Sequence, residues 1–424
     1  MKNKIILNRK ELQIHVKNKY SKVFDLFSDK VGIVNAIMER HELDKYGIYM
    51  YQCLSASSVQ LFGCSREVTS GGLGVSFCRE DAIIGCIAEA IERYCMTYIP
   101  VNELKYCELN ELPNENKFDQ FYLYSDNQYK ENSCFANPKV DKIYWTKIYS
   151  LSNKDKHKYW PASLIYLPFD ISNPVAETSS TGLAAGFTID DCILSGLLEL
   201  IERDALMINF MQKLPANEID LTTLSENNSD FVNVVKQDYN IKIYKLISDI
   251  KVPIFLTYIW TKKHGKIHYG IGASANIDSE LAISKSVRES LFTYFYSLNI
   301  MDLKQDNPLK IKTLYEHFLY YQDEKFEKLL FHGEKIKYVR EKYDFDYLIN
   351  ELEKLNLEIY FKELTTDDVK NSGLKVVKTI VPQLIDLNKT HSMQRLGAER
   401  FFSVPRKLNL QFSTELSTDP HPFP

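Results

Sequence analysis

Residues 182–204 read GLAAGFTIDDCILSGLLELIERD, and residues 72–94 read GLGVSFCREDAIIGCIAEAIERY. The two segments align without a gap over 23 residues and are identical at nine positions. Both contain the pattern E-x-x-E-R, which comprises Glu89, Glu92 and Arg93 in the first copy and Glu199, Glu202 and Arg203 in the second. Self-similarity of this kind indicates a structural unit that the chain uses more than once.

A third, incomplete copy runs from Gly272 to Phe292 and reads GASANIDSELAISKSVRESLF. It keeps the opening glycine and one glutamate, Glu289, but has Phe292 at the position of the second glutamate. Residues three apart share a helix face, so each complete copy presents two carboxylates in one direction. A hard cation, most often Mg²⁺ bound to phosphates, is held by carboxylates of this kind.

The stretches just before the first glutamate of each complete copy, AIIGCIA at 82–88 and CILSGLL at 192–198, are nearly all apolar or small, so these two helices are expected to be largely buried. An unpaired buried carboxylate costs several kcal/mol, and these glutamates must therefore be paired or bound to a metal ion. The alternative is a solvated helix face on which Arg93 and Arg203 form salt bridges. A single E-x-x-E-R would favour that alternative, whereas two copies favour the metal site.

Glycine and small residues precede the first two helices, in SGGLG at 70–74 and STGLAAG at 180–186. They are predicted to form turns in front of the helices. The free N–H groups at a helix N-terminus attract anions, so these turns are candidate phosphate sites. Neither is a Walker loop, because no G-K-[ST] follows.

Composition excludes several classes of function. The 424 residues are 45% hydrophobic and 25% charged, with a formal net charge of −4, which gives no electrostatic footprint for nucleic acid. No apolar run approaches the roughly 18 residues that a membrane span needs. The N-terminus lacks the apolar stretch of a signal peptide, so a cytoplasmic protein is expected. The eight cysteines include no C-x-x-C pair, which argues against a zinc site.

Helical and strand patterns alternate irregularly, which favours an α+β fold over a doubly wound sheet. Helices are predicted over 80–98, 190–212 and 279–297, and strands over 241–248, 252–260 and 374–382. Residues 305–360 are rich in Lys, Glu, Tyr and Phe at helical spacing, and a helical insertion is expected there.

These segments resemble the YcaO-domain proteins, in particular the azoline-forming cyclodehydratases of thiazole/oxazole-modified peptide biosynthesis, including the streptolysin-type toxins. The resemblance extends from about Ser28 to Pro424. Besides the E-x-x-E-R helices it rests on four segments: ELTTDDV at 363–369, VVKTIVPQL at 376–384, RLGAER at 395–400 and PHPFP at 420–424. For PHPFP, a frayed polyproline II end is the ordinary alternative.

The resemblance implies a YcaO-type fold, with mixed or antiparallel sheets covered by helices and repeated strand–glycine turn–helix units around a central acidic nucleotide and Mg²⁺ site. It implies one domain over residues 28–424, preceded by an N-terminal extension over 1–27 and ending in a proline-rich tail over 419–424. The reaction implied is the ATP- and Mg²⁺-dependent conversion of Cys, Ser or Thr in a ribosomal precursor peptide to thiazolines or oxazolines.

The same resemblance assigns roles to individual residues. The Mg²⁺ ligands would be Glu89, Glu92, Glu199 and Glu202. The ATP-binding residues would be Ser180, Glu89, Arg93, Glu199, Glu202, Arg203, Glu289 and Arg400, with the arginines neutralising phosphate or bracing the carboxylates. The proline tail would act in catalysis through Pro420, Pro422 and Pro424, whose terminal carboxylate would position the substrate or act as a base.

Three positions depart from the family pattern. Phe292 stands where Gln is frequent, Leu73 where Lys is frequent, and Gln383 where Gly is common. The first two concern nucleotide affinity, and they keep open the alternative of a non-catalytic scaffold subunit. Thioamide or amidine formation by the same family is the nearest other chemistry, and an unrelated Mg²⁺-dependent phosphotransferase is a further alternative.

Partners are also implied. The roughly 25 residues ahead of the matching region are too few for a leader-peptide clamp, so a separate leader-binding, ubiquitin-activating-like partner protein is expected. A flavin dehydrogenase that oxidises azolines to azoles is a further expected component. The chain is expected to form a homodimer or a hetero-oligomer, and neither a nucleic acid nor a membrane is expected among its partners.

Overall fold

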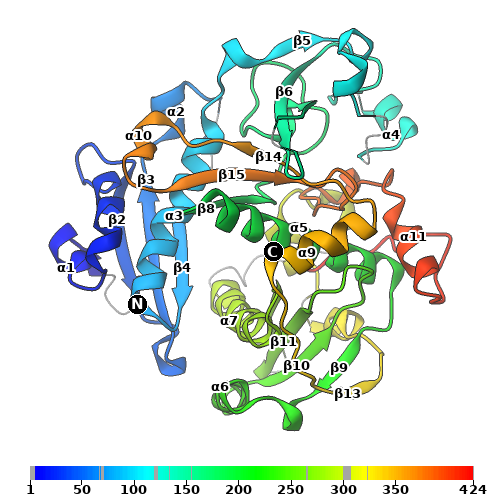
Figure 1. Ribbon diagram of the computed structural model, residues 1–424. Helices are drawn as coiled ribbons and strands as arrows, with labels where there is room; N and C mark the ends of the chain where they lie inside the picture. Colours follow the sequence, from blue (N-terminus) through cyan, green and yellow to red (C-terminus); the bar gives the residue numbers. More distant parts are fainter. Residues whose placement is uncertain are drawn as a thin grey trace. The chain divides into compact units, whose positions relative to one another are not determined.

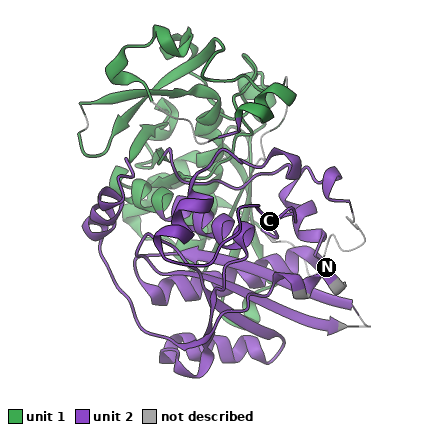
Figure 2. Ribbon diagram, turned by 90° about the vertical axis from the view of Figure 1, so that its right-hand side faces the viewer, with its two compact units in different colours: residues 1–121, 126–197, 359–381 green, residues 122–125, 198–358, 382–424 purple. Residues whose placement is uncertain are grey.

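The computed structural model describes residues 5–65, 67, 71–118, 123–132, 134–153, 155–263, 266–298, 307–321 and 323–423. The chain divides into two compact units (Figure 2). Unit 1 comprises residues 1–121, 126–197 and 359–381, and unit 2 comprises residues 122–125, 198–358 and 382–424. The boundary falls inside the long helix α5 (Ile189–Gln212), after Leu197.

Unit 1 contains two antiparallel sheets. The first has the order β1-β2-β3-β4 and consists of β1 (Ile5–Leu7), β2 (Val34–Arg40), β3 (Tyr49–Ser55) and β4 (Gly72–Ser76). Helix α3 (Arg79–Thr97) packs against β3 and β4 (Figure 1). Residues 5–7, which lie in the predicted N-terminal extension, therefore form an edge strand of this sheet.

The second sheet of unit 1 has the order β5-β6-β14-β15-β8, and β7 pairs with β6. Its strands are β5 (Lys105–Cys107), β6 (Ile143–Ser150), β7 (His157–Pro161), β8 (Leu183–Gly186), β14 (Tyr360–Glu363) and β15 (Lys375–Ile380). The predicted buried strand over 374–382 is confirmed, because every residue of β15 after Lys375 is buried.

Unit 2 is built on one sheet with the order β12-β11-β10-β9-β13. Its strands are β9 (Asn217–Asp220), β10 (Asn240–Lys245), β11 (Ile254–Lys263), β12 (Lys266–Ala275) and β13 (Lys335–Lys337). Helix α7 (Ser279–Leu298) packs against β11 and β12 (Figure 1). Only the β9–β13 pairing in this sheet is parallel, so the sheet is mixed, as predicted.

Shorter helices complete both units. They are α1 (Arg9–Gln13), α2 (Ser58–Phe62), α4 (Asp126–Glu131), α6 (Glu226–Lys236), α8 (Leu314–Leu319), α9 (Phe345–Lys354), α10 (Asp367–Lys370) and α11 (Arg400–Lys407). Segments of 3₁₀ helix lie at Asn18–Leu26, Asp44–Tyr46, Val101–Glu103, Leu109–Glu111, Asn114–Asn116, Ala162–Leu164, Leu221–Thr223, Pro308–Lys310, Asp323–Leu329 and His391–Met393.

The three sequence copies fold as three strand–helix pairs: β4–α3, β8–α5 and β12–α7. Counted from the glycine that opens each copy, every helix begins seven residues later, at Arg79, Ile189 and Ser279. The residue before the helix caps it in the second and third copies. Thr188 Oγ1 accepts the N–H of Asp191 at 3.1 Å, and Asp278 Oδ1 accepts that of Glu280 at 3.0 Å.

One part of the repeat prediction is wrong. Gly72 and Gly74 lie in strand β4 and not in a turn at a helix N-terminus, and Ser70 is outside the described residues. A Cβ on Gly72 would lie 2.0 Å from the carbonyl oxygen of Cys86, and one on Gly74 would lie 1.7 Å from that of Ala82. These glycines therefore allow the strand to approach the body of helix α3, and they do not form a phosphate-binding turn.

The second copy does contain a turn, but the turn precedes the strand. Gly182 has a φ of +82°, which favours glycine, and β8 separates it from helix α5. The glycine turn is therefore not at the helix N-terminus in this copy either, so neither segment forms the predicted phosphate-binding turn.

The other predicted elements agree closely with the structure. The three predicted helices match α3, α5 and α7, and the two predicted strands in unit 2 match β10 and β11. The predicted helical insertion over 305–360 needs correction, because Lys335–Lys337 form a strand and pair with β9. Residues 305, 306 and 322 of that segment are outside the described residues. In the described part of the chain, no helix has the length and apolarity needed to cross a bilayer.

Candidate active site

In unit 1, Glu89 lies on the face of α3 that packs on β4. Its Oε2 accepts the backbone N–H of Leu73 at 2.8 Å, and its Oε1 lies 3.5 Å from Nη2 of Arg93. The Glu89 side chain is 36% exposed, so solvent or a ligand can reach it. The first glutamate of this copy is thus held by its own strand and by the arginine of its own motif.

Glu92 makes a different contact. Its Oε1 accepts the backbone N–H of Ala185, in β8, at 2.7 Å. The side chain is half-buried, between α3 and the strand of the second copy. Burial raises the pKa of the nearby Cys192 thiol to about 12, and the charge of Glu92 adds to that rise. Cys192 is therefore a protonated, buried side chain.

In unit 2, Glu202 is the most buried of the predicted site residues on helix α5. It is 6% exposed, and its Oε2 accepts the backbone N–H of Ala275, in β12, at 3.2 Å. Burial raises its pKa to about 7, and the negative charge of Glu289 adds to that rise. The carboxylate of Glu289, on α7, is thus close enough to oppose the ionisation of Glu202, on α5.

Arg203 interacts with both glutamates of its motif at long range. Its Nη2 lies 3.9 Å from Glu199, and its Nε lies 3.8 Å from Glu202. The buried Nε has no hydrogen-bond partner among the described residues. An additional acceptor at this position would therefore remove an unsatisfied buried donor.

Helix α7 adds a cation to this group. Lys285 Nζ lies 3.6 Å from Glu289, one helical turn away, and the charge of Glu289 raises the pKa of Lys285. Phe292 follows on the same helix face, and its ring lies 6.1 Å from that of Tyr296. The side chain at this position cannot bind a metal or hydrogen-bond a nucleotide.

These features fit Mg²⁺ and a nucleotide phosphate. The donors are carboxylate oxygens, which are the ligands of Mg²⁺, and a cation would offset both the burial of Glu202 and the charge of Glu289, which together raise the pKa of Glu202. The free Nε of Arg203 suits a phosphate oxygen. In the described part of the chain, no three His, Cys, Asp or Glu side chains form a metal site by themselves.

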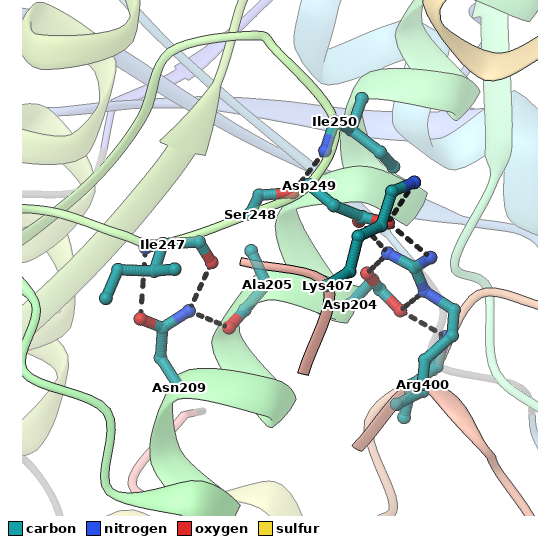
Figure 3. A network of polar contacts seen from close by, with 10 residues as sticks. Asp204, Ala205, Asn209, Ile247, Ser248, Asp249, Ile250, Arg400 and Lys407 are labelled. Atoms are coloured by element: carbon teal, nitrogen blue, oxygen red, sulfur yellow. Dashed lines mark hydrogen bonds and ion pairs between the residues drawn. The ribbon is translucent and has the colours of Figure 1, made fainter. Parts of the chain in front are cut away.

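Arg400 lies in a buried polar network in unit 2 (Figure 3). Its Nε and Nη2 donate to the two carboxylate oxygens of Asp204 at 2.9 and 2.7 Å, and its Nη2 also donates to Asp249 at 2.7 Å. Lys407 Nζ lies 3.6 Å from the same Asp249. In this structure Arg400 therefore braces α5 against α11, and its contact with a nucleotide stays a prediction.

Ser180 lies in unit 1, directly before β8, and its carbonyl oxygen accepts the N–H of Leu183 at 2.8 Å. Beside it lies a residue that the sequence analysis missed. Lys378, on β15, is only 5% exposed, and its Nζ donates to the carbonyl oxygen of Ser179 at 2.9 Å. A lysine inside a run of β-branched residues is the signal that could have indicated it.

The described part of the proline tail is buried in unit 2. Pro420 and Pro422 are both buried, and the carbonyl oxygen of Pro420 accepts a hydrogen bond from the hydroxyl of Tyr321. The ring of His421 stacks on that of His317. Pro424 lies outside the described residues. Residues 420–423 are thus packed, and they do not form a frayed end.

Comparison with known proteins gives one family. The sequence model described as YcaO cyclodehydratase, ATP- and Mg²⁺-binding, matches residues 73–385. No curated protein sequence gives a significant match.

Several solved structures have a fold similar to that of this chain. A heterocyclase in complex with substrate and cofactor has a TM-score of 0.75 and 22% identity over 96% of this chain and 57% of its own. The Escherichia coli microcin synthetase McbBCD complex with pro-MccB17 bound contains a chain with a TM-score of 0.65 and 16% identity, over 92% of this chain and 96% of that one. YcaO from Methanopyrus kandleri, bound with AMPPCP and Mg²⁺, has a TM-score of 0.61 and 13% identity, over 90% and 92%.

The chain spans 57% of the length of that heterocyclase and 51% of the heterocyclase TruD, which has a TM-score of 0.58 and 24% identity over 82% of this chain. At these identities the likeness shows the fold.

Proposed function

Because this chain belongs to the YcaO cyclodehydratase family, we propose that it uses ATP and Mg²⁺ to convert Cys, Ser or Thr residues of a ribosomal precursor peptide to thiazolines or oxazolines. The sequence-based predictions of the family, of an enzyme, and of ATP and Mg²⁺ as cofactors are confirmed at the level of the family. The observation that carries the proposal is the buried Glu202, which accepts the backbone N–H of Ala275 at 3.2 Å and lies 3.8 Å from Nε of Arg203.

In the proposed reaction, the thiol or hydroxyl of the substrate residue attacks the carbonyl carbon of the preceding amide. The amide oxygen takes the γ-phosphoryl group of ATP and leaves as phosphate, and the amide nitrogen loses its proton to form the C=N bond of the ring. The peptide loses one water per ring, and ATP becomes ADP and phosphate. An amide oxygen is a poor leaving group until it is phosphorylated, and Mg²⁺ neutralises charge during the transfer.

We assign the metal-binding role to Glu89 and Glu92 in unit 1 and to Glu199 and Glu202 in unit 2. Glu289 completes the acidic group on α7, and its charge already affects the ionisation of Glu202. Arg93 and Arg203 bind phosphate and orient the glutamates of their own motifs, which they approach to 3.5 Å and 3.9 Å.

Ser180 lies beside the nucleotide in this proposal, and the neighbouring Lys378 adds a buried positive charge. The Lys378 ammonium already donates to the loop that contains Ser180, since it is 2.9 Å from the carbonyl oxygen of Ser179. Arg400 acts mainly as a brace, because Asp204 and Asp249 occupy its guanidinium.

The proline tail acts in substrate positioning. Burial of Pro420 and Pro422 in unit 2, the unit that contains Glu199 and Glu202, supports this role. We propose that Pro424 provides a carboxylate to the active site, as the sequence resemblance implies.

Partner proteins are part of the proposal. The microcin synthetase that resembles this chain is a complex with its pro-peptide bound. We therefore propose that a separate leader-binding protein presents the precursor peptide, and that a flavin dehydrogenase oxidises the azolines. A homodimer or hetero-oligomer follows from the same reasoning.

The test is Mg²⁺-dependent phosphate release from ATP, measured with a candidate leader-binding protein and a candidate cysteine-containing precursor peptide. The proposal expects release that the peptide stimulates, with loss of one water per ring in the mass spectrum. Glu199→Gln should abolish both, and Glu226→Gln, which changes an exposed glutamate on α6, should leave both intact. Exchange of oxygen for sulfur would instead identify thioamide formation. Binding of both partners without phosphate release would identify a non-catalytic scaffold. Phe292 and Leu73, which depart from the family pattern, are the reason for keeping this alternative.

A further inference from the structure

The C-terminal segment is attached to the end of helix α5 before it reaches the proline tail. Gln212 and Ser413 exchange two hydrogen bonds, at 3.2 and 3.0 Å, between the amide side chain and the backbone. Ser417 then donates its N–H to the carbonyl oxygen of Met211 at 2.8 Å. These bonds align residues 413–417 with the last turn of α5, and the residues that follow continue from a fixed point.

The next contact is a pair of stacked imidazoles. The rings of His317, on α8, and His421 lie 3.9 Å apart at an interplanar angle of 8°. Both side chains are fully buried. His317 Nε2 lies 3.0 Å from the carbonyl oxygen of Lys389, and His421 Nε2 lies 2.8 Å from that of Asn388. A carbonyl oxygen only accepts, so both Nε2 atoms have a proton.

The remaining ring nitrogens fix the charge of the pair. His421 Nδ1 accepts the backbone N–H of Phe423 at 3.3 Å, so it has no proton and the imidazole is neutral. His317 Nδ1 has no hydrogen-bond partner among the described residues. Two neutral rings stack without charge repulsion, and the bond from Phe423 turns the backbone of the tail around His421.

A second contact from the same segment holds the preceding residue. The hydroxyl of Tyr321, just after α8, donates to the carbonyl oxygen of Pro420. Phe210, on α5, lies edge-to-face against Tyr321 at 6.3 Å and against Phe423 at 6.1 Å. The tail therefore runs between residues 317–321, which include the end of α8, and α5, the helix that contains Glu199 and Glu202.

The positive charge of Arg203 also acts on His421. Burial lowers the pKa of His421 to about 4, and the positive charge of Arg203 contributes to that fall. His421 thus lies within the electrostatic reach of the arginine that adjoins Glu202.

We infer that His317 and Tyr321 form a clamp that holds residues 420–423 against α5 and so positions the end of the chain for the reaction. The inference rests on the proposed function, and it makes His317, Tyr321 and His421 positioning residues. Removal of one half of the clamp should lower kcat and leave nucleotide binding intact, because the carboxylates assigned to Mg²⁺ lie on helices other than α8.

Two variants test the clamp. His317→Ala removes the stack, whereas His317→Phe keeps a flat ring over His421 and loses only the bond to Lys389. The control is His332→Ala, which changes an exposed histidine between the 3₁₀ helix Asp323–Leu329 and β13. The readouts are hydrogen–deuterium exchange of residues 413–423, binding of Mg²⁺ with AMP-PNP by calorimetry, and kcat and KM for the precursor peptide.

His317→Ala should speed exchange in residues 418–423, lower kcat by about tenfold or more and leave AMP-PNP affinity within about twofold. His317→Phe should restore most of the slow exchange of the tail and most of kcat. Fast tail exchange with an unchanged kcat would overturn the inference, and so would a lower kcat with unchanged tail exchange.

If His317→Ala does not fold, His421→Ala provides the same test from the tail side, with His421→Phe as its conservative partner. Tail exchange and AMP-PNP binding do not depend on turnover. If the wild-type chain has no cyclodehydratase activity, the clamp is still tested by exchange in residues 418–423, and only the proposed function fails.

Discussion

Glu202 accepts the backbone N–H of Ala275, and Ala275 lies three residues after Gly272, the glycine that opens the third copy. Glu92 makes the equivalent bond to Ala185, three residues after Gly182, which opens the second copy. The second glutamate of each motif therefore ties its helix to the strand of the next copy. The same bond is present in two copies, so Glu92 and Glu202 stabilise the fold in addition to providing carboxylates for the candidate site.

The same relationship explains Phe292. This residue occupies the second-glutamate position of the third copy, and the sequence contains no fourth copy with a strand that could donate to it. A carboxylate there would lack the backbone N–H that Glu92 and Glu202 receive. A phenylalanine at this position therefore costs none of the strand contacts that the second glutamates of the first two copies make.

The two roles of Glu202 can be separated by substitution. In Glu202→Gln the amide oxygen still accepts the N–H of Ala275, and a buried charge is removed, so the metal-free protein should be as stable as the wild type or more stable. Glu202→Ala leaves that N–H unpaired and should lower the free energy of unfolding by about 1–3 kcal/mol. Urea unfolding measures both, and equal losses in the two variants would contradict the assignment.

Binding of Mg²⁺ with AMP-PNP tests the other role of Glu202, as a ligand of the metal ion. Affinity should fall at least about tenfold in Glu202→Gln, because a carboxylate ligand is lost while the fold is kept. Glu226→Gln is the matched control on the exposed face of α6. Unchanged affinity in Glu202→Gln would restrict the residue to its architectural role.

Arg400 gives a second prediction. Asp204 is fully buried, and Arg400→Met would leave it without its charged partner. Loss of one member of a buried pair typically costs about 3–5 kcal/mol, which urea unfolding would detect. The double variant Asp204→Asn with Arg400→Met should recover part of that loss, because the uncompensated charge is gone.

The same variants decide whether Arg400 contacts phosphate. Its guanidinium is already bonded to Asp204 and Asp249, so the folded double variant should bind Mg²⁺ with AMP-PNP within about twofold of the wild type. A tenfold or greater loss of affinity would instead assign Arg400 to the nucleotide.

The strand–helix contact of the first copy can be tested with two glycines. A Cβ on Gly74 would meet the carbonyl oxygen of Ala82 at 1.7 Å, so Gly74→Ala should lower the free energy of unfolding by about 3 kcal/mol or more. Gly85, within α3, would place its Cβ no nearer than 3.8 Å to Gly74. Gly85→Ala should therefore be neutral or stabilise the protein by up to about 1 kcal/mol. A larger loss from Gly85→Ala than from Gly74→Ala would refute this account of the packing.

The repeated helices were predictable because their apolar spacing and the first glutamate survive in all three copies. The glycines of β4 were misassigned because a glycine-rich segment is typical of a turn, and nothing local indicates that Gly74 faces the backbone of Ala82. Lys378 was missed because a run of β-branched residues predicts a buried strand regardless of one polar member. The bond between Asp204 and Arg400 joins residues 196 positions apart, which no local pattern reveals.

The stacked histidines predict a dependence of stability on pH. Burial lowers the pKa of His421 to about 4 and that of His317 to about 2, both below the ordinary value of 6.5. In the unfolded chain each imidazole takes up a proton near pH 6.5, whereas the folded protein excludes it. Stability from these groups is therefore fully present above pH 6.5 and is lost as the pH falls from 6.5 towards 4.

The expected size is up to about 1.4 kcal/mol per pH unit for each histidine. The groups that affect His421 are His391, Arg203 and Asp386, besides its bond to Asn388, and they remain in the variant His421→Phe. The difference in free energy of unfolding between the wild type and His421→Phe should shrink by at least about 1 kcal/mol from pH 7 to pH 5. Urea unfolding at pH 7, 6 and 5 measures this difference. A difference that is constant over that range would mean that His421 takes up its proton equally in the folded and unfolded states, and the stack could not then be the neutral pair that holds the tail.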